Sequence, residues 1–446
     1  EAHSTYRPVI NGAQAFQSYL LGKQGPHLIR LYSSFSEHVK FSITLAEEMK
    51  KRIFIAIHYM EIGGAERALL GVLSSLPPEQ YDIDLFIYSH QGPFMDYIPE
   101  YVHVLPEQPT YACFEKPLRQ VILEGHGLMA AARLWAKVAD RIHNRHLTGE
   151  VSSLLDEVGR ATVRILPSLN YLGEYDLAIS FLNPHYIVRD KVRARVKMAW
   201  IHTDYSFISI NAARELPVWT AYDHIISISP SVTQSFLGVF PSLANKIIEL
   251  ENPLPTALIT AQADAFDARP EMPDELVLLS IGRFCTPKNF PYAVDTMAEL
   301  CKLRRNAHWY IIGYGGDEAL IRQRIAEKQM QEYVTILGKK SNPYPYIKAC
   351  DLYVQPSLYE GKAVTVKEAQ FLGKPVAITA FPTAKSQLTD GVDGVILPLG
   401  NAAETAQALH ELLNNKPLLQ ELATQCRKTD YSGQAELRQI IESLIS

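Results

Sequence analysis

Short apolar runs alternate with longer amphipathic stretches along most of this chain, from about residue 52 onward. Continuous runs of Val, Ile and Leu are typical of strands that are covered on both faces of a parallel sheet. Apolar residues that recur every three or four positions predict the helices that cover such a sheet. The predicted strands lie at 53–57, 83–88, 177–181, 196–201, 224–229, 276–281, 308–312, 334–337, 352–355, 375–379 and 394–397. The predicted fold class is therefore α/β, with two doubly wound, Rossmann-like sheets.

The length of the chain predicts more than one domain, because 446 residues exceed what a single hydrophobic core usually organises. We expect an N-terminal extension of unknown role, two domains, and a C-terminal helix that packs back toward the first domain. The bounds of these segments are 1–48, 49–255, 256–430 and 431–446. Met49 and the basic residues after it look like a translation start. The proline-rich stretch at 251–255 and the polar stretch that continues to Pro273 look like a linker.

Composition and charge exclude several classes of protein. The 43 Lys and Arg residues against 48 Asp and Glu leave a net charge of −5, which excludes the overall basic field of a protein that coats nucleic acid. The five cysteines are scattered, so neither a disulfide framework nor a zinc site is predicted. No apolar run approaches the roughly 18 residues that span a bilayer, and the N-terminus has no signal-peptide pattern. We expect a cytoplasmic protein that binds no nucleic acid.

Residues 106–170 break the alternation and contain a long helical pattern over 118–146. Leu134, Val138 and Ile142 share one side of this predicted helix, and basic residues outnumber acidic ones along it. A basic amphipathic helix can lie on an anionic membrane, which would make the protein peripheral at the inner face of the membrane. An ordinary solvated helix explains the pattern as well, because Lys and Arg stems routinely cover apolar surface.

Ligands of open α/β sheets bind beyond the carboxyl ends of the strands, so the segments that follow the strands hold the candidate site residues. Gly63 and Gly64 follow the first strand and permit a tight turn into a helix whose N–H groups attract an anion. Arg283 and Lys288 follow the strand at 276–281, and two cations there suit a diphosphate. Each feature taken alone is equally compatible with a plain turn or with ordinary surface charge.

Two carboxylates follow the strand at 352–355. Glu360 and Glu368 are separated by seven residues, with Glu360 on the loop and Glu368 early in the next predicted helix. Carboxylates accept hydrogen bonds from vicinal hydroxyls, so the pair suits a sugar and a ribose. The spacing by itself is common, and it is the place of the pair after a strand that favours a site.

An ordered set of motifs runs over about residues 52–394. It consists of Gly-Gly-Ala-Glu at 63–66, Gly-Arg at 282–283 with Lys-Asn at 288–289, Gly-Tyr-Gly at 313–315, Pro-Ser-x-Tyr-Glu-Gly at 356–361, the two glutamates at 360 and 368, Glu-Ala-x-x-x-Gly-Lys-Pro-Val at 368–376, and Asp-Gly-x-x-Gly at 390–394. This set resembles the GT-B glycosyltransferases of family 4. The segments at 199–205 and 222–229 are similar to the subgroup that builds bacterial surface polysaccharides.

The resemblance implies a retaining transfer of a sugar from a nucleotide-diphosphate donor, a UDP- or GDP-sugar, to a glycan or lipid-linked acceptor. The second domain would bind the donor and the first the acceptor, with the two domains facing a central cleft. By the same resemblance, Glu368 holds the ribose, Glu360 holds the donor sugar, Arg283 and Lys288 bind the diphosphate, and His202 lies near the reacting sugar. The remaining donor-binding positions that it implies are Gly63, Gly64, Gly282, Gly313, Gly361, Lys362 and Ala363.

The resemblance implies no metal and no other cofactor. Asp82 and Asp84 imitate the Asp-x-Asp motif of metal-dependent transferases, but the stretch at 81–86 alternates like a strand, which is the preferred interpretation. The chain departs from the family at Lys362-Ala363, where many members have a small or apolar residue and then Pro, and at 385–387, where a Glu is common. Two other interpretations stay open: a GT-B isomerase or hydrolase of a nucleotide sugar, and a non-catalytic subunit that binds one.

Overall fold

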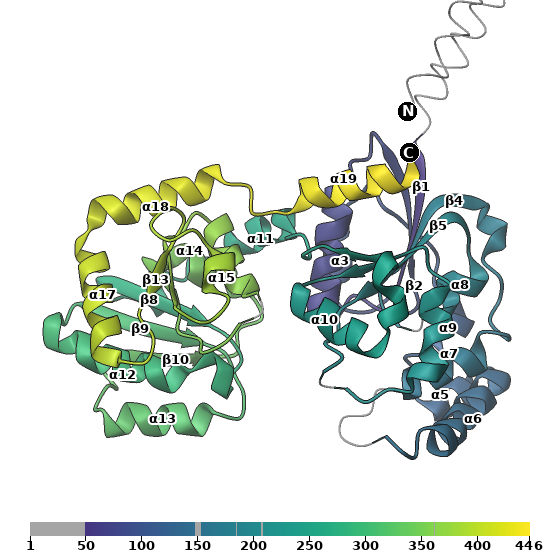
Figure 1. Ribbon diagram of the computed structural model, residues 1–446, viewed down its shortest axis with the longest axis horizontal. Coiled ribbons are helices and arrows are strands. Elements are labelled where there is room, and N and C mark those ends of the chain that lie inside the picture. The colour runs from purple at the N-terminus through teal and green to yellow at the C-terminus, as the bar shows by residue number, and fades with distance from the viewer. Residues whose placement is uncertain (1–49, 148–152, 184, 207, 361) are drawn as a thin grey trace, which may run out of the picture. The chain divides into compact units, whose positions relative to one another are not determined.

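A computed structural model describes residues 50–147, 153–183, 185–206, 208–360 and 362–446 of the chain (Figure 1). The expected extension at 1–48 lies outside these residues, as does Gly361. The described part forms two β-sheets in which the paired strands are parallel, and helices flank each sheet. The predicted α/β class with two Rossmann-like sheets is therefore confirmed.

The first sheet, which we call the first lobe together with its flanking helices, has the strand order β3-β2-β1-β4-β5-β6-β7. Its strands are β1 (Lys51–Ile57), β2 (Tyr81–Ile87), β3 (His103–Val104), β4 (Glu174–Ser180), β5 (Arg193–Ile201), β6 (His224–Ser227) and β7 (Ile247–Glu249). Its helices are α3 (Gly64–Ser75), α4 (Pro109–Ala112), α5 (Leu118–Leu123), α6 (Gly127–His143), α7 (Leu154–Thr162), α8 (Tyr186–Lys191), α9 (Ala212–Thr220) and α10 (Pro230–Val239). The order reverses between β1 and β4, and such switch points are where ligands bind.

The second sheet, with its helices the second lobe, has the order β10-β9-β8-β11-β12-β13. Its strands are β8 (Leu276–Ile281), β9 (Ala307–Ile312), β10 (Val334–Gly338), β11 (Leu352–Gln355), β12 (Val376–Thr379) and β13 (Val395–Leu397). Its helices are α11 (Thr256–Ala263), α12 (Phe290–Leu303), α13 (Glu318–Glu327), α14 (Tyr344–Ala349), α15 (Val364–Phe371), α16 (Ala384–Gln387), α17 (Ala402–Asn414) and α18 (Lys416–Lys428). Here the order reverses between β8 and β11.

Two details of the sequence-based prediction are wrong. The edge strands β3 and β7 were not expected, because two or three residues are too few to show an apolar run. The single helix expected over 118–146 is divided into α5 and α6. Gly125 lies between them with a φ of 86°, a left-handed conformation that ends a helix and that glycine adopts without strain.

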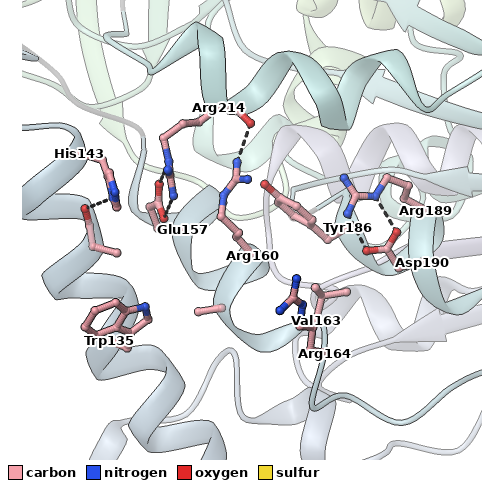
Figure 2. Close-up of a pocket in the computed structure, with 12 residues that line it drawn as sticks. Trp135, His143, Glu157, Arg160, Val163, Arg164, Tyr186, Arg189, Asp190 and Arg214 are labelled. Carbon is pink, nitrogen blue, oxygen red and sulfur yellow. Dashed lines mark hydrogen bonds and ion pairs between the residues drawn. The ribbon is translucent and has the colours of Figure 1, made fainter.

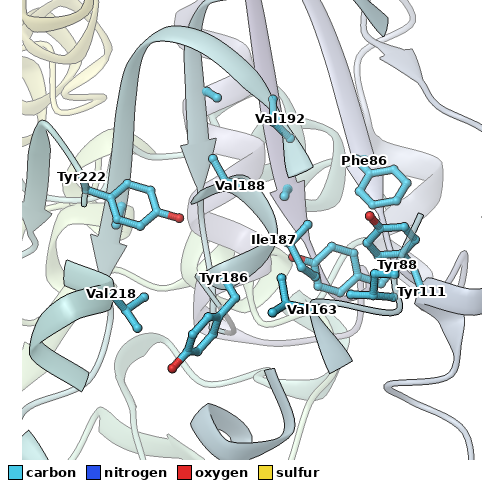
Figure 3. Close-up of a cluster of buried hydrophobic side chains, with 14 of the residues drawn as sticks. Phe86, Tyr88, Tyr111, Val163, Tyr186, Ile187, Val188, Val192, Val218 and Tyr222 are labelled. Carbon is cyan, nitrogen blue, oxygen red and sulfur yellow. The ribbon is translucent and has the colours of Figure 1, made fainter. Parts of the chain in front are cut away.

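The two faces of the first sheet carry separate apolar cores. Along β1, Phe54 and Ala56 belong to one core, while Ile53, Ile55 and Ile57 belong to the other, as the alternation of side chains in a strand requires. Figure 3 shows part of the first core, in which Tyr186, Ile187 and Val188 of α8 gather with Tyr88, Tyr111 and Val163. The segment that breaks the strand–helix alternation therefore packs against the first lobe.

The last helix, α19 (Gln434–Ile445), covers α3 of the first lobe (Figure 1). Leu437, Ile441 and Ile445 are buried in the same apolar core as the inner side of α3. Arg438 Nε donates a hydrogen bond of 3.2 Å to the carbonyl of Ser75, at the end of α3. The C-terminal segment thus contributes to the core of the lobe that begins the fold.

Candidate active site

Lys288 and Glu360 meet at the switch point of the second sheet. Lys288 ends a short 3-10 turn that follows β8, and Glu360 lies on the loop between β11 and α15. The Lys288 Nζ donates to Glu360 Oε1 at 2.6 Å. Because β8 and β11 are neighbours, the topology brings together two residues that are 72 positions apart in the chain.

Glu360 is buried and is held by several donors at once. Its Oε1 also accepts hydrogen bonds from Ser357 Oγ at 2.6 Å and Gln355 Nε2 at 3.2 Å. Its backbone carbonyl accepts a hydrogen bond of 2.6 Å from Thr383 Oγ1. A buried carboxylate is stable only when it is paired and hydrogen-bonded in this way, and the arrangement fixes its orientation.

Glu368 is the fully buried member of the pair of carboxylates and lies in α15. Its Oε1 accepts from Tyr344 Oη at 2.8 Å and from Arg67 Nη1 at 3.1 Å. Its Oε2 is buried and has no hydrogen-bond partner among the described residues. Burial raises the pKa of Glu368, whereas the bonds to Arg67 and Tyr344 act in the opposite direction. A buried acceptor without a partner is costly, so this oxygen is suited to a donor from a ligand.

Arg67 is a site residue that sequence reasoning missed. It belongs to α3 of the first lobe and pairs with Glu368 of the second, and its own Nε is buried without a partner among the described residues. Arg67 directly follows the Gly-Gly-Ala-Glu motif and lies in the first turn of α3. A cation beside a glycine-rich turn was the available signal.

The predicted glycines lie where the backbone of the loops comes close to other groups. A Cβ on Gly313 would meet the carbonyl oxygen of Gly282 at 2.0 Å, so the loops after β8 and β9 can approach only because residue 313 has no side chain. A Cβ on Gly63 would meet the Glu66 carboxylate at 2.1 Å, whereas the space beside Gly64 is open. The Arg283 side chain is exposed and forms no hydrogen bond or ion pair with any described residue.

His202 follows β5 in the first lobe. Its ring stacks on Trp200 with an interplanar angle of 9° and lies 4.7 Å from the ring centroid of Phe181. Burial lowers the pKa of His202 to about 4, so the imidazole is neutral near pH 7. Its Nε2 is buried and has no partner within the described parts of the chain. This nitrogen can therefore form a hydrogen bond without bringing a charge.

Two further histidines at the same edge of the first sheet were not predicted. His58 follows β1, and its Nδ1 lies 2.5 Å from Glu115 Oε1. His185 precedes α8, and its Nδ1 lies 2.8 Å from Ser180 Oγ. Burial lowers the pKa of His185 to about 3, and the nearby imidazoles of His202 and His58 act in the same direction. The carboxyl ends of β1, β4 and β5 thus carry three imidazoles, and no local motif reveals the two at 58 and 185.

Lys362 and Ala363 contact a different group of residues. Lys362 Nζ donates to the carbonyl of Ser386 at 2.7 Å and pairs with Glu251 at 2.9 Å. The Ala363 N–H donates to Gln387 Oε1 at 2.7 Å, which ties the loop to α16. Burial tends to raise the pKa of Glu251, but the hydrogen bonds and charges of Lys362 and Lys367 outweigh it, so the pKa is lowered. The departure from the family pattern at Lys362 therefore coincides with an ion pair between Lys362 and Glu251, whose side chains are 30% and 34% exposed.

The described residues do not contain a recognisable metal centre. Asp82 and Asp84 lie inside β2, so the strand interpretation of this motif is confirmed. Asp84 accepts hydrogen bonds from Tyr175 at 2.6 Å and lies 2.6 Å from His103 Nδ1. Among the described residues, no group of three or more His, Cys, Asp or Glu side chains is arranged to hold a metal ion.

Within the same residues, no helix is both long and apolar enough to cross a membrane.

Comparison with known families assigns part of the chain. A model of the family described as glycosyl transferases group 1 matches residues 262–429, which is most of the second lobe. An alpha-D-kanosaminyltransferase from Streptomyces kanamyceticus is 26% identical over 152 residues, which cover 34% of this chain and 39% of that protein. A lipopolysaccharide core biosynthesis glycosyltransferase from Rhizobium meliloti, LpsE, is 23% identical over 35% of this chain and 45% of its own length. The chain thus spans less than half of the length of these curated relatives.

Solved structures match over nearly the whole chain. HepE from Anabaena, in complex with UDP and glucose, has a TM-score of 0.57 at 15% identity and covers 88% of this chain and 99% of its own. A mutant of TarM from S. aureus, in complex with fondaparinux, alpha-GlcNAc-glycerol and UDP, has a TM-score of 0.58 at 13% identity and covers 89% of this chain and 100% of its own. At this identity the likeness concerns the fold, and the predicted GT-B fold of two Rossmann-like domains is confirmed.

Proposed function

We propose that this chain is a glycosyltransferase that moves a sugar from a nucleoside-diphosphate donor to a glycan or lipid-linked acceptor. The observation that carries the proposal is the unpartnered, fully buried Oε2 of Glu368. This residue lies in α15, directly after the loop of Glu360, which pairs with Lys288 at the switch point of the second sheet. These residues fall within the part of the chain that matches the glycosyl transferases group 1. The named relatives with sequence similarity are sugar transferases, which supports the same activity.

The proposal assigns the donor to the edge of the second lobe. Glu368 Oε2 accepts a hydrogen bond from a ribose hydroxyl, and Glu360 binds hydroxyls of the donor sugar. Lys288 and the exposed Arg283 bind the diphosphate, one as a point charge and the other as a fork. Gly63, Gly64, Gly282 and Gly313 let the backbone approach the phosphates, and Lys362 and Ala363 border the sugar. The proposal includes no metal ion.

The proposed transfer retains the configuration of the sugar. The bond between the anomeric carbon and the phosphate oxygen breaks, and a bond from that carbon to the acceptor oxygen forms on the same face. The leaving phosphate oxygen takes the proton of the acceptor hydroxyl, so no carboxylate is needed as a nucleophile. Fixed cations stabilise the negative charge that develops on the departing diphosphate without having to reorganise. His202 is neutral near pH 7, so it can contact the sugar without opposing the positive charge that develops there.

The acceptor side of the proposal concerns the first lobe. Its sheet edge carries His58, His185 and His202, which present polar but largely desolvated groups. Such groups suit an acceptor that offers saccharide hydroxyls better than they suit a charged acceptor. A contact between the first lobe and an anionic membrane is part of the same proposal, since it would bring a lipid-linked acceptor to this edge.

The proposal is tested by removing the two diphosphate cations. A thermal-shift panel of UDP- and GDP-sugars first identifies the donor, because a ligand of the native state raises the melting temperature. Arg283→Ala and Lys288→Ala are then each expected to lower the rate of transfer by at least about tenfold, the equivalent of about 1.4 kcal/mol. Nucleoside diphosphate release with an acceptor present measures this rate.

Lys302→Ala is the matched control, because Lys302 pairs with Glu299 on the exposed side of α12 and should leave the rate unchanged. Unchanged rates in both site variants would exclude the assignment of the diphosphate. Stabilisation by a nucleotide sugar without any turnover would indicate a binding subunit, and product formed without an acceptor would indicate a hydrolase or isomerase.

A further inference from the structure

The first lobe contains a pocket of about 610 Å³ that the proposed reaction does not use (Figure 2). Side chains from α6, α7, α8 and α9 line it. The basic residues of the lining are Arg160, Arg164, Arg189, Arg214 and His143, and the acidic ones are Glu157 and Asp190. Cations therefore outnumber anions in its wall, although the chain as a whole is acidic.

The acidic residues do not satisfy all of these guanidinium groups. Arg214 forms a two-pronged pair with Glu157, with Nη2 2.8 Å from Oε2. Arg189 forms a similar pair with Asp190, with Nη2 2.6 Å from Oδ2 (Figure 2). Arg164 is exposed and has neither a hydrogen bond nor an ion pair with any described residue. The pocket therefore keeps one cation free for a ligand.

Arg160 provides a second unsatisfied donor. One of its terminal nitrogens donates to the carbonyl of Arg214 at 2.6 Å and to Asp156 at 3.1 Å. Its Nε is buried and has no partner in the described part of the chain. The ring of Tyr186 holds the guanidinium groups of Arg160 and Arg189 in place. Their central carbons lie 5.5 Å and 4.7 Å from the centroid of this ring. Arginine donors fixed in this manner suit the oxygens of a phosphate.

An exposed apolar stripe on α6 lies beside this pocket. It consists of Leu128, Leu134, Trp135, Val138 and Ile142, and Leu128 and Trp135 are 76% and 62% exposed. On the opposite side of α6, Met129, Ala136 and Ala139 are buried against the lobe. Trp135 belongs to both features, since it also lines the pocket. The apolar surface and the arginine pocket are therefore continuous.

Basic side chains flank the stripe. Lys137 and Arg141 of α6 are exposed and form no ion pair with a described residue. Arg133 differs, because its guanidinium donates to the carbonyls of Cys113 and Lys116, the latter at 2.7 Å, and so holds the turn before α5. The free cations of α6 thus lie along an apolar face, the arrangement with which helices dock on anionic membranes.

We propose that the arginine pocket binds the phosphate of a lipid headgroup while the α6 stripe enters the membrane interface. An amphiphile with an anionic phosphate next to an apolar chain matches a cationic pocket that continues into an apolar surface. Apolar burial supplies part of the affinity, and the flanking cations add attraction to the anionic surface. The inference does not depend on the donor site, because membrane binding takes place without a nucleotide sugar.

Sedimentation of the full chain with vesicles tests this inference. We expect the protein to sediment with vesicles of equal parts phosphatidylglycerol and phosphatidylcholine, and to stay in solution with phosphatidylcholine alone. Arg164→Glu is expected to weaken vesicle binding at least about tenfold, because the reversal removes one attraction to the anionic surface and adds one repulsion. Arg305→Glu is the matched control, since Arg305 is exposed in the second lobe, between α12 and β9.

The apolar part of the surface is tested separately. Leu128→Ser combined with Trp135→Ser should also lower vesicle binding at least about tenfold. Leu320→Ser is the control, because Leu320 is 48% exposed on α13 of the second lobe. Circular dichroism checks that each variant keeps its fold. Equal losses of vesicle binding in the site and control variants would overturn the inference, since non-specific apolar or electrostatic adsorption would then explain the binding.

Inorganic phosphate distinguishes the possible sources of the ligand. At constant ionic strength, phosphate should release the protein from vesicles more effectively than chloride, and the Arg164→Glu variant should lose this sensitivity. Phosphate that acts no better than chloride would overturn the role of the pocket. A higher melting temperature in phosphate without any vesicle binding would indicate a site for a free anion, and a dimer that buries the stripe would indicate a second copy as the occupant. Each of these outcomes overturns the proposal of a lipid headgroup.

Discussion

The carboxyl edges of the two sheets carry different chemistry. The edge of the second sheet is ionic, with Lys288 paired to Glu360 and Glu368 paired to an arginine that comes from the other lobe. The corresponding edge of the first sheet carries imidazoles, and burial keeps two of them, His185 and His202, neutral near pH 7. The switch-point topology is the same in both lobes, so the backbone does not cause the difference.

This difference separates what the fold supplies from what individual residues supply. Each sheet provides a place for a ligand beyond its strand ends, and the side chains decide whether that place suits charge. The ionic edge belongs to the part of the chain that the family model matches. The imidazole edge lies outside that part, as does the segment with the arginine pocket and the apolar stripe. The match to the family model is therefore confined to the lobe that carries the ionic edge.

The largest expected effect contrasts two tryptophans, one from each lobe. Trp309 of β9 is 1% exposed and donates to Ser280 Oγ at 2.9 Å, whereas Trp135 of α6 is 62% exposed. Trp309→Ala should lower the free energy of unfolding by about 3–5 kcal/mol, because it leaves a cavity. Trp135→Ala should change that free energy by no more than about 0.5 kcal/mol. Urea unfolding followed by circular dichroism measures both, and a comparable loss in the two variants would show that α6 is not a free surface.

The next largest effect concerns acid and the imidazole edge. Burial lowers the pKa of His202 from 6.5 to about 4, so between these pH values the unfolded chain binds a proton that the folded chain does not. The contribution of His202 to the free energy of unfolding is therefore fully present above pH 6.5, and it falls as the pH drops toward 4. Each pKa unit is worth about 1.4 kcal/mol, so His202 accounts for a loss of about 3 kcal/mol over this range.

Urea unfolding at several pH values measures this loss. His202→Gln should reduce the dependence of stability on pH by the share of this imidazole, while the buried His185 continues to contribute. His90→Gln is the control for the loss of an imidazole, since His90 is exposed in the same lobe. An unaltered slope in His202→Gln would mean that the imidazole is solvated in the folded protein.

A smaller effect is expected at the ionic edge. Glu368→Gln should weaken the binding of the nucleoside diphosphate that the thermal-shift panel selects by roughly tenfold, or about 1.4 kcal/mol. An amide is a weaker acceptor for ribose hydroxyls than a carboxylate, and it pairs less well with Arg67. Isothermal titration calorimetry measures this affinity. An analogue without ribose hydroxyls should bind both proteins equally, and a parallel loss for the analogue would contradict the ribose assignment.

Glu318→Gln provides the reference for that measurement. Glu318 pairs with Arg322 on the surface of α13, where an ion pair contributes little. Its replacement should leave nucleotide affinity unchanged. Weaker binding in this variant would point to a general effect of charge on the acidic chain and would remove the contrast between the two edges.

Much of the fold was predictable because its signals are local. The continuous apolar runs marked β8 and β11 at their observed bounds, and their order predicted two parallel sheets. The failure over 118–146 also has a local cause, since the helical periodicity continues past Gly125 although the backbone turns there. Periodicity records which faces are apolar, and it does not record where a single φ angle ends a helix.

The candidate site was predictable only in part. Lys288 and Glu360 were found because each follows a strand in a motif of its own, and the structure brings them to 2.6 Å. Arg67 was passed over although it follows a glycine-rich turn, because its partner Glu368 lies 301 residues away and no local pattern links the two. His58 and His185 were missed for the same reason, since an isolated histidine has no pattern.

The sequence by itself therefore determined the α/β class, the two sheets and the chemical types available at their edges. Only the tertiary structure decided which of these groups meet, which lose their water and which stay without a partner. The arginines at 160, 164, 189 and 214 show why, because they lie on three helices and on the turn after α7, and they form one pocket only after these elements have packed. A strand or a helix follows from neighbours in sequence, whereas desolvation and pairing depend on what the rest of the chain places around a group.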